Sequence, residues 1–142
     1  MKAHLSRRYH FSASHRLHTE AYDVAQNKAV FGKCNNPYGH GHNYTVQVTL
    51  SGQVDPATGM VCNLAELDAF AQANLLARFD HTNLNTLDCF ANKVSTTENL
   101  SMEIYRIFQK FPSGHLERVH IEETSNNSFD YAGEATSAPG WK

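Results

Sequence analysis

One short segment, FGKCNNPYGHGHNY (residues 31–44), constrains the fold of this chain more than any other part of it. From His40 to Leu50 every second residue is His42 or an apolar or aromatic residue, and the residues between them are polar or glycine. Strict alternation of this kind predicts a strand, about 40–52, with one buried and one solvated face. Side chains at i and i+2 point the same way, so both histidines lie on the buried face and can converge on one metal ion.

An earlier strand is predicted at about 7–15, where Phe11, Ala13 and His15 share one face. If the two strands pair as antiparallel neighbours, His15 comes close to His40 and His42. Three imidazoles with one open position are typical ligands of a catalytic zinc ion. The alternative is that each histidine is simply packed or solvated, and spacing alone leaves both interpretations open.

The remaining elements predict an α+β domain. Residues 16–33 are expected to form a polar loop, and 55–59 a turn. Asn63 is a good N-cap for a helix that ends near Phe79, and the segment STTE (95–98) fits a capping box for a second helix. Strands are expected at about 115–123 and 128–132. The order ββααββ predicts a four-stranded antiparallel sheet with two helices on one face, in a single domain (1–142) whose residues 133–142 form a loose tail. Subunit association is the expected cover for the opposite face.

Composition excludes several classes of partner. The 142 residues carry a formal net charge of −2, so nothing indicates nucleic acid or a membrane surface. No targeting segment is recognised at the N-terminus, and no apolar run is long enough to span a membrane. Three cysteines at unrelated spacings favour free thiols in a reducing, cytoplasmic compartment.

Three further positions carry candidate chemistry. Cys34 lies beside Lys33 and near the histidines, where a cation and a metal would favour the thiolate; the alternative is an inert loop thiol. Asp80-His81 places a carboxylate next to an imidazole, which suits proton transfer, although a histidine at a helix C-terminus is also favoured by the helix dipole. Glu123 ends an apolar strand and could accept paired donors from a flat heterocycle, or it could be plain surface.

Taken together, these segments resemble the 6-pyruvoyl-tetrahydropterin synthase family, and in particular its eukaryotic branch. The motifs that carry the resemblance span nearly the whole chain in the family's order: FSASHRL (11–17), the segment 31–44, DPATGMV (55–61), Asp80-His81 with TNLN, STTEN (95–99) and ETSNN (123–127). The resemblance implies a tunnelling fold, in which the sheets of three subunits join into a barrel and two trimers stack into a homohexamer with sites between subunits.

The resemblance also implies a role for each candidate residue. The positions of the family's zinc ligands are His15, His40 and His42. The positions of its catalytic residues are Cys34, Asp80 and His81. Its pterin-anchoring glutamate matches Glu123, and Thr97 and Glu98, which a capping box explains structurally, match a segment that helps to line the pterin pocket. The basic residues Arg16, Lys28 and Lys33 are candidates for contacts with a triphosphate.

The implied reaction is conversion of 7,8-dihydroneopterin triphosphate to 6-pyruvoyl-tetrahydropterin with loss of triphosphate, a zinc-dependent lyase step of tetrahydrobiopterin-type biosynthesis. One alternative is 6-carboxy-tetrahydropterin synthase of the queuosine pathway, whose cysteine typically lies closer to the histidine pair than in this chain, where Cys34 lies six residues before His40. A relative that cleaves the pterin side chain to a hydroxymethyl product would typically alter this cysteine. A non-catalytic, zinc-stabilised pterin-binding oligomer would need neither Cys34 nor Asp80-His81.

Overall fold

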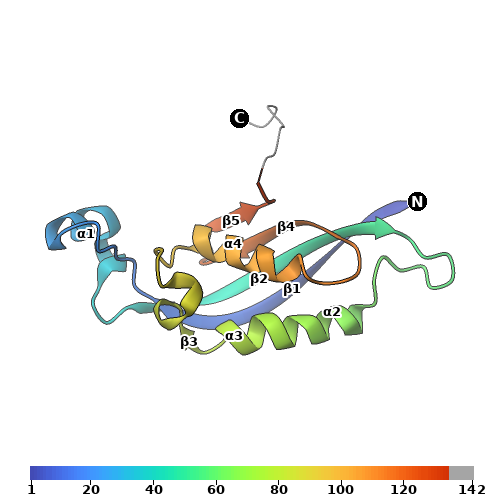
Figure 1. The fold of residues 1–142 in the computed structure, drawn as a ribbon, viewed down its shortest axis with the longest axis horizontal. Coiled ribbons are helices and arrows are strands. Elements are labelled where there is room, and N and C mark those ends of the chain that lie inside the picture. Colours follow the sequence, from blue (N-terminus) through green and yellow to red (C-terminus); the bar gives the residue numbers. More distant parts are fainter. Residues whose placement is uncertain (135–142) are drawn as a thin grey trace.

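The computed structural model describes residues 1–134, in which a twisted sheet is covered on one face by helices (Figure 1). The sheet has five strands in the order β3-β1-β2-β4-β5. The strands are β1 (Lys2–His15), β2 (His40–Gln53), β3 (Thr82–Asn83), β4 (His115–Glu122) and β5 (Ser128–Tyr131). The α-helices are α1 (Val24–Phe31), α2 (Leu64–Ala71), α3 (Ala77–Phe79) and α4 (Thr97–Phe108). The predicted α+β class is confirmed, with one strand more than expected.

The pairing of β1 with β2 is the longest feature of the sheet. The two strands run antiparallel over their full length, from Lys2 opposite Gln53 to His15 opposite His40, and Ala13 lies opposite His42. The first strand therefore starts earlier than the predicted residue 7. This register puts the three histidines at the same end of the strand pair.

Both long helical segments pack on the same face of β1. Phe11 stacks on Phe79 of α3 with ring centroids 5.8 Å apart, and Tyr9 stacks on Phe108 of α4 at 6.2 Å. The rings of Phe11 and Tyr44 join β1 to β2 at 5.1 Å. Because Tyr9 and Phe11 are two residues apart, these contacts confirm that both helical segments lie on one side of the sheet.

The helical segment predicted to start at Asn63 begins there and has an irregular middle. The Asn63 side chain accepts hydrogen bonds from the main-chain N–H groups of Ala65 and Glu66, which is N-cap geometry. A π-helical turn, η2 (Gln72–Leu76), joins α2 to α3, so the segment reaches Phe79 without a break. Leu67, Ala71 and Leu75 of the predicted stripe are fully buried, whereas Leu64 at its start is 37% exposed.

Helix α4 has its N-cap one residue later than the predicted capping box implies. Its N-cap is Thr96, whose side chain accepts from the N–H of Asn99, and not Ser95. Ser95 is fully buried, and its carbonyl accepts a hydrogen bond from His15. This tertiary contact takes Ser95 out of the cap, so Thr96 fills it.

The region predicted as a polar loop contains secondary structure. Asp23 and Gln26 form a capping box for α1, and a 3₁₀ turn, η1 (Gly32–Asn35), follows that helix. Figure 1 shows α1 standing out from one end of the sheet. The missed strand β3 is only two residues long and pairs in parallel with Ala13 and Ser14. Between β3 and α4 the chain forms two further 3₁₀ turns, η3 (Leu84–Thr86) and η4 (Asp88–Phe90).

The helix-free face of the sheet is polar. Cross-strand side-chain pairs on it include Ser6 with Thr49 at 2.8 Å and Ser12 with Asn43 at 2.6 Å. These polar groups bond to one another, so this face of the sheet does not require a hydrophobic cover. The need to bury the face is therefore no argument for subunit association on this side.

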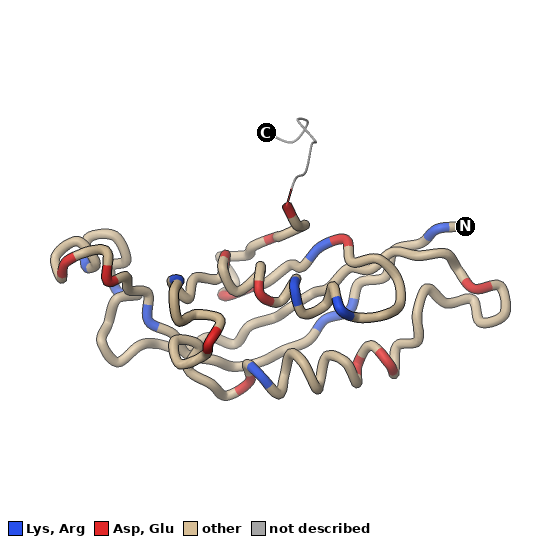
Figure 2. Tube along the Cα trace, viewed as in Figure 1, with Lys and Arg blue, Asp and Glu red and all other residues tan. Residues whose placement is uncertain are grey.

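Figure 2 shows Lys and Arg interspersed with Asp and Glu along the trace of residues 1–134. Within residues 1–134, no helix combines the length and the apolar character needed to cross a membrane. The cysteines Cys34, Cys62 and Cys89 are free thiols. Most of the predicted loose tail lies outside the described residues.

Candidate active site

The structure brings the three predicted histidines together at one end of the β1–β2 pair. One nitrogen from each of His15, His40 and His42 lies within 4.8 Å of the other two. The closest pair, His15 Nε2 and His40 Nε2, is 3.1 Å apart. Two nitrogens bound to a tetrahedral zinc ion at its usual bond length would be about 3.3 Å apart. The cluster is therefore already shaped for a metal ion.

Hydrogen bonding prepares His15 as a ligand. Its Nδ1 lies 2.7 Å from the carbonyl oxygen of Ser95, to which it donates. That bond assigns the proton to Nδ1 and leaves the lone pair of Nε2 directed at the cluster. Burial lowers the pKa of His15, and the neighbouring imidazoles of His40 and His42 act in the same direction. Although the Ser95 hydrogen bond opposes them, these effects favour the neutral ring that metal binding requires.

The second half of the cluster contains two buried nitrogens without a hydrogen-bond partner in the described residues, Nδ1 of His40 and Nε2 of His42. Burial lowers the pKa of His42, partly opposed by the charge of Glu123. A buried polar atom without a partner is unfavourable, and a metal ion bound by the three imidazoles would satisfy Nε2 of His42.

Glu123 and Thr97 meet beside the histidines. Oε2 of Glu123 lies 4.0 Å from His15 Nε2 and 3.9 Å from His42 Nε2. Thr97, which is 2% exposed in the first turn of α4, donates its hydroxyl hydrogen to the same carboxylate oxygen. Glu98, the next residue, is exposed and makes no recorded contact with this group in the described part of the chain. The structure thus joins Thr97 and Glu123 to the cluster, and leaves Glu98 at the surface.

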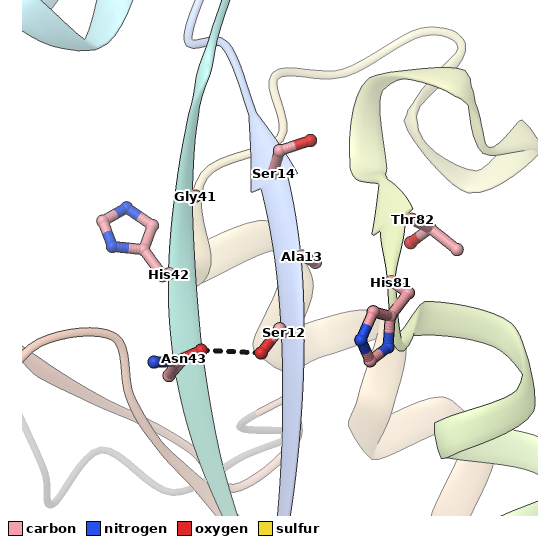
Figure 3. A pocket seen from close by; sticks show the side chains of 8 residues that line it. All are labelled: Ser12, Ala13, Ser14, Gly41, His42, Asn43, His81 and Thr82. Carbon is pink, nitrogen blue, oxygen red and sulfur yellow. Dashed lines mark hydrogen bonds between the residues drawn. The ribbon is translucent and has the colours of Figure 1, made fainter.

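Asp80 and His81 form a pair, but away from the cluster of their own chain. His81 Nδ1 lies 3.0 Å from Asp80 Oδ1. A hydrogen bond from the Ser12 N–H, reinforced by His81, holds the pKa of Asp80 below its usual range, so the carboxylate is ionised and can orient the imidazole. In Figure 3 the ring of His81 lies beside β1 and the ring of His42 beside β2, with both strands between them. These two residues also line a hollow of about 310 Å³ that crosses the strand pair.

The backbone at His81 is in a rare conformation. Its φ angle is +59°, the only positive value at a non-glycine residue in the described chain. Its N–H donates to the Ser12 carbonyl at 2.6 Å, which fixes the turn against β1. The side chain is 83% exposed, so the imidazole is presented outward rather than packed.

Cys34 lies in η1 and is half-buried. Its carbonyl accepts a hydrogen bond from the N–H of Leu17 at 2.8 Å, which ties η1 to the chain just after His15. The thiol is not a member of the three-histidine group found in residues 1–134. The structure therefore anchors Cys34 by its main chain beside the segment that carries His15.

A cavity of about 880 Å³ opens next to His15. Arg16, Tyr38, Asn85 and Lys93 are among the residues that line it. Lys93 is already paired with Glu103, whereas Lys28 and Lys33 are exposed. Of the three basic residues predicted to contact a triphosphate, only Arg16 lines this cavity.

Sequence reasoning missed two contributors to the site. The Ser95 carbonyl holds a histidine that lies 80 residues away, and no local pattern signals such a contact. Tyr44 is buried beside His42 with ring centroids 5.6 Å apart, and its hydroxyl has no partner within the described residues. Its place two residues after His42 on the same strand face could have indicated this.

Comparisons with known proteins agree over nearly the whole chain. A family model described as 6-pyruvoyl tetrahydropterin synthase matches residues 4–134. A human protein named 6-pyruvoyl tetrahydrobiopterin synthase is 49% identical over 135 residues, covering 94% of this chain and 93% of the human protein. The protein of that name from Drosophila melanogaster is 47% identical over 135 residues, covering 92% of this chain and 80% of its own length. The solved structure of Caenorhabditis elegans 6-pyruvoyl tetrahydropterin synthase matches with a TM-score of 0.90 at 42% identity, covering 94% and 97% of the two chains.

Proposed function

Because the chain belongs to the 6-pyruvoyl tetrahydropterin synthase family, we propose that it is a lyase that converts 7,8-dihydroneopterin triphosphate to 6-pyruvoyl-tetrahydropterin and triphosphate. The observation that supports this activity most strongly is the convergence of His15, His40 and His42 beside Glu123. A cavity next to His15 is large enough for such a substrate. The net reaction releases triphosphate and moves hydrogens within the substrate, so it needs no external oxidant or reductant.

The ion proposed for the cluster is Zn²⁺, held by His15, His40 and His42 with one position left for the substrate. When bound, zinc supplies Lewis acidity, which makes the carbon-bound hydrogens next to a substrate oxygen easier to remove. Imidazole ligands also suit copper, so metal analysis of the purified protein distinguishes the two ions.

Protons are moved by this chain's own side chains. The Cys34 thiolate accepts a proton from the substrate side chain at Sγ. His81, with Nδ1 held by Asp80, exchanges protons through Nε2. Since His81 faces away from the cluster of its own chain, we assign it to the cluster of a neighbouring subunit.

Glu123 anchors the pterin ring. An ionised carboxylate can accept two parallel N–H bonds from the amino-pyrimidine edge of a pterin, which fixes the ring's orientation. The Thr97 hydroxyl holds one oxygen of Glu123 and so limits its rotation. Glu98, exposed in the same helical turn, is assigned to the rim of this pocket. With the ring fixed, only the side chain of the substrate reaches the histidines.

The assembly proposed is a homohexamer, a dimer of trimers, in the cytoplasm. The outward presentation of His81 supports sites between subunits, and the three free cysteines support a reducing compartment. Light scattering of the purified protein measures the subunit number directly.

A product assay tests the proposal. Zinc-loaded protein is incubated with 7,8-dihydroneopterin triphosphate, and the pterin is identified by mass alongside released triphosphate. A pyruvoyl side chain with stoichiometric triphosphate is expected. A carboxy product with acetaldehyde would assign the protein to the queuosine pathway. Cys34→Ala should lower turnover to a small residual rate without loss of pterin binding, while Cys62→Ala, which alters a cysteine outside the site, should retain full turnover.

A further inference from the structure

A set of hydrogen bonds joins η1 (Gly32–Asn35), here called the Cys34 turn, to the segment that follows His15. The Leu17 N–H donates to the Cys34 carbonyl at 2.8 Å, and Nδ2 of Asn35 donates to the Leu17 carbonyl at 2.7 Å. The guanidinium Nε of Arg16 donates to the Asn35 carbonyl at 3.0 Å. Cys34 and Asn35 therefore hold both main-chain groups of Leu17, two residues from a metal-ligand position.

The Asn35 side chain is the buried centre of this joint. It is 6% exposed, and its amide nitrogen also lies 3.0 Å from Nδ1 of His18. Both amide hydrogens thus have acceptors, Leu17 O and His18 Nδ1. A buried amide with both donors satisfied has one stable orientation, because turning it would leave these groups unpaired.

The chain that leaves the Cys34 turn leads directly to His40. After η1, the Gly39 N–H donates to the Asn36 carbonyl at 2.9 Å, and His40 follows directly. Gly39 has a φ angle of +75°, and a Cβ there would approach the His15 carbonyl oxygen to 3.1 Å. The turn closed by Asn36 and Gly39 therefore passes tightly over the His15 backbone, and the side-chain amide that holds the preceding turn η1 is that of Asn35.

We propose that Asn35 is a positioning residue, which holds the Cys34 turn in a fixed relation to the His15–His40 end of the strand pair. It rests on the proposed function only for the role of Cys34. Asn35 touches neither the histidine cluster nor the thiol chemistry directly, and it acts through the main chain of Leu17 and Cys34.

Kinetics of Asn35→Ala give the first readout. A reacting group displaced by about 1 Å can lose on the order of 100-fold in rate, so kcat should fall roughly 10- to 100-fold. KM and bound zinc should stay unchanged, since Glu123 and the histidines are untouched. In a Cys34→Ala background, Asn35→Ala should cause no further loss, because two residues acting as one unit are not additive.

Asn27→Ala is the matched control. Asn27 is also a fully buried asparagine between His15 and His40, and its amide bonds to the carbonyls of Thr19, Tyr22 and Asp23. It has no bond to Cys34, Asn35 or Leu17 among the described contacts. Its loss should lower the thermal midpoint while kcat stays at the wild-type value.

A second readout does not depend on enzyme activity. Alkylation by iodoacetamide is followed at Cys34 by peptide mass spectrometry, with Cys62 and Cys89 of the same molecule as references. Release of the turn should speed alkylation of the half-buried Cys34 on the order of fivefold, the equivalent of one hydrogen bond. If the wild type forms no product, the proposed function fails, and this measurement still tests Asn35.

Several results would overturn the role of Asn35. They are an unchanged kcat and Cys34 alkylation rate, an equal kcat loss in the Cys34→Ala background, a parallel loss of zinc, or the same kcat loss in Asn27→Ala. If Asn35→Ala does not fold, Asn35→Gln keeps the amide but lengthens the side chain by one methylene. It should show the same kcat loss with unchanged zinc, and a wild-type kcat would refute the role.

Discussion

Binding of zinc to the three-histidine cluster should raise the thermal stability of this protein by a predictable amount. Little reorganisation is needed, because strand register sets His15 opposite His40 and the Ser95 carbonyl already orients His15. At free zinc 100-fold above the dissociation constant, binding to the folded state adds about 2.7 kcal/mol. For a chain of this size, each kcal/mol raises the midpoint by about 3–4 °C. The expected shift is therefore about 10 °C.

Differential scanning calorimetry in zinc-buffered solution and in excess chelator measures this shift. His42→Ala removes one of the three ligands and should reduce the shift to less than about 3 °C, since two imidazoles bind zinc far more weakly. His10→Ala is the matched control, because His10 is exposed on the polar face and lies 3.1 Å from Thr45 Oγ1, outside the cluster. It should keep the full shift. Equal midpoints with and without zinc, or a full shift in His42→Ala, would refute the reasoning.

Three further predictions concern stability and the proposed catalytic pair, Asp80 and His81. Burial lowers the pKa of His15, so below about pH 6.5 the unfolded chain binds a proton more readily than the folded one, and the free energy of unfolding of the metal-free protein falls. Urea unfolding between about pH 7.5 and 5 should show this decrease, and His15→Gln should make it smaller. Asp68→Ala removes the acceptor of the buried Tyr9 hydroxyl at 2.8 Å and should cost about 1–2 kcal/mol in urea unfolding, whereas Asp88→Ala at an exposed position should change stability by less than about 0.5 kcal/mol. His81→Gly should be more stable than His81→Ala by about 1 kcal/mol, because glycine relieves the positive φ, and both should lack turnover; an active His81→Gly variant would show that only the backbone of this residue matters.

The strands and the histidine cluster were predictable because alternation is a local code. It identifies which side chains of β2 face the helices, and antiparallel pairing then places the end of β1 opposite the start of β2. His15 and His40 became partners on this reasoning alone. The helix that starts at Asn63 was predictable for a similar reason, since an N-cap acts within a single turn.

Elements that depend on polar or distant contacts were missed. α1 has little apolar periodicity, and its order comes from the Asp23–Gln26 capping box and the buried Asn27 amide. The Asp-x-x-Gln pattern was a readable signal. β3 has no signal of its own. Its two residues are held beside β1 because the Ser12 N–H donates to Asp80 Oδ1 and the His81 N–H donates to the Ser12 carbonyl.

At the candidate site, the sequence indicated the histidines and Glu123 but not the main-chain contacts that hold them in place. The metal-ligand positions and Glu123 came together because strand ends meet at one edge. The Ser95 carbonyl acts on His15 from far along the chain, and Thr96 rather than Ser95 caps α4. Such contacts depend on the packed structure and leave no periodic trace.

The long pairing of β1 with β2 also has a consequence for the order of folding. His15 and His40 are 25 residues apart, and the opposite end, Lys2 with Gln53, is separated by about twice as many. Loop closure costs less entropy for the nearer pair, so we expect the pairing of β1 with β2 to start at the histidine end and to extend towards the N-terminus. Kinetic refolding tests this hypothesis: Ala13→Gly should slow folding, whereas Ala3→Gly should mainly speed unfolding. The opposite pattern would place the nucleus at the far end, and the histidine end would then close late.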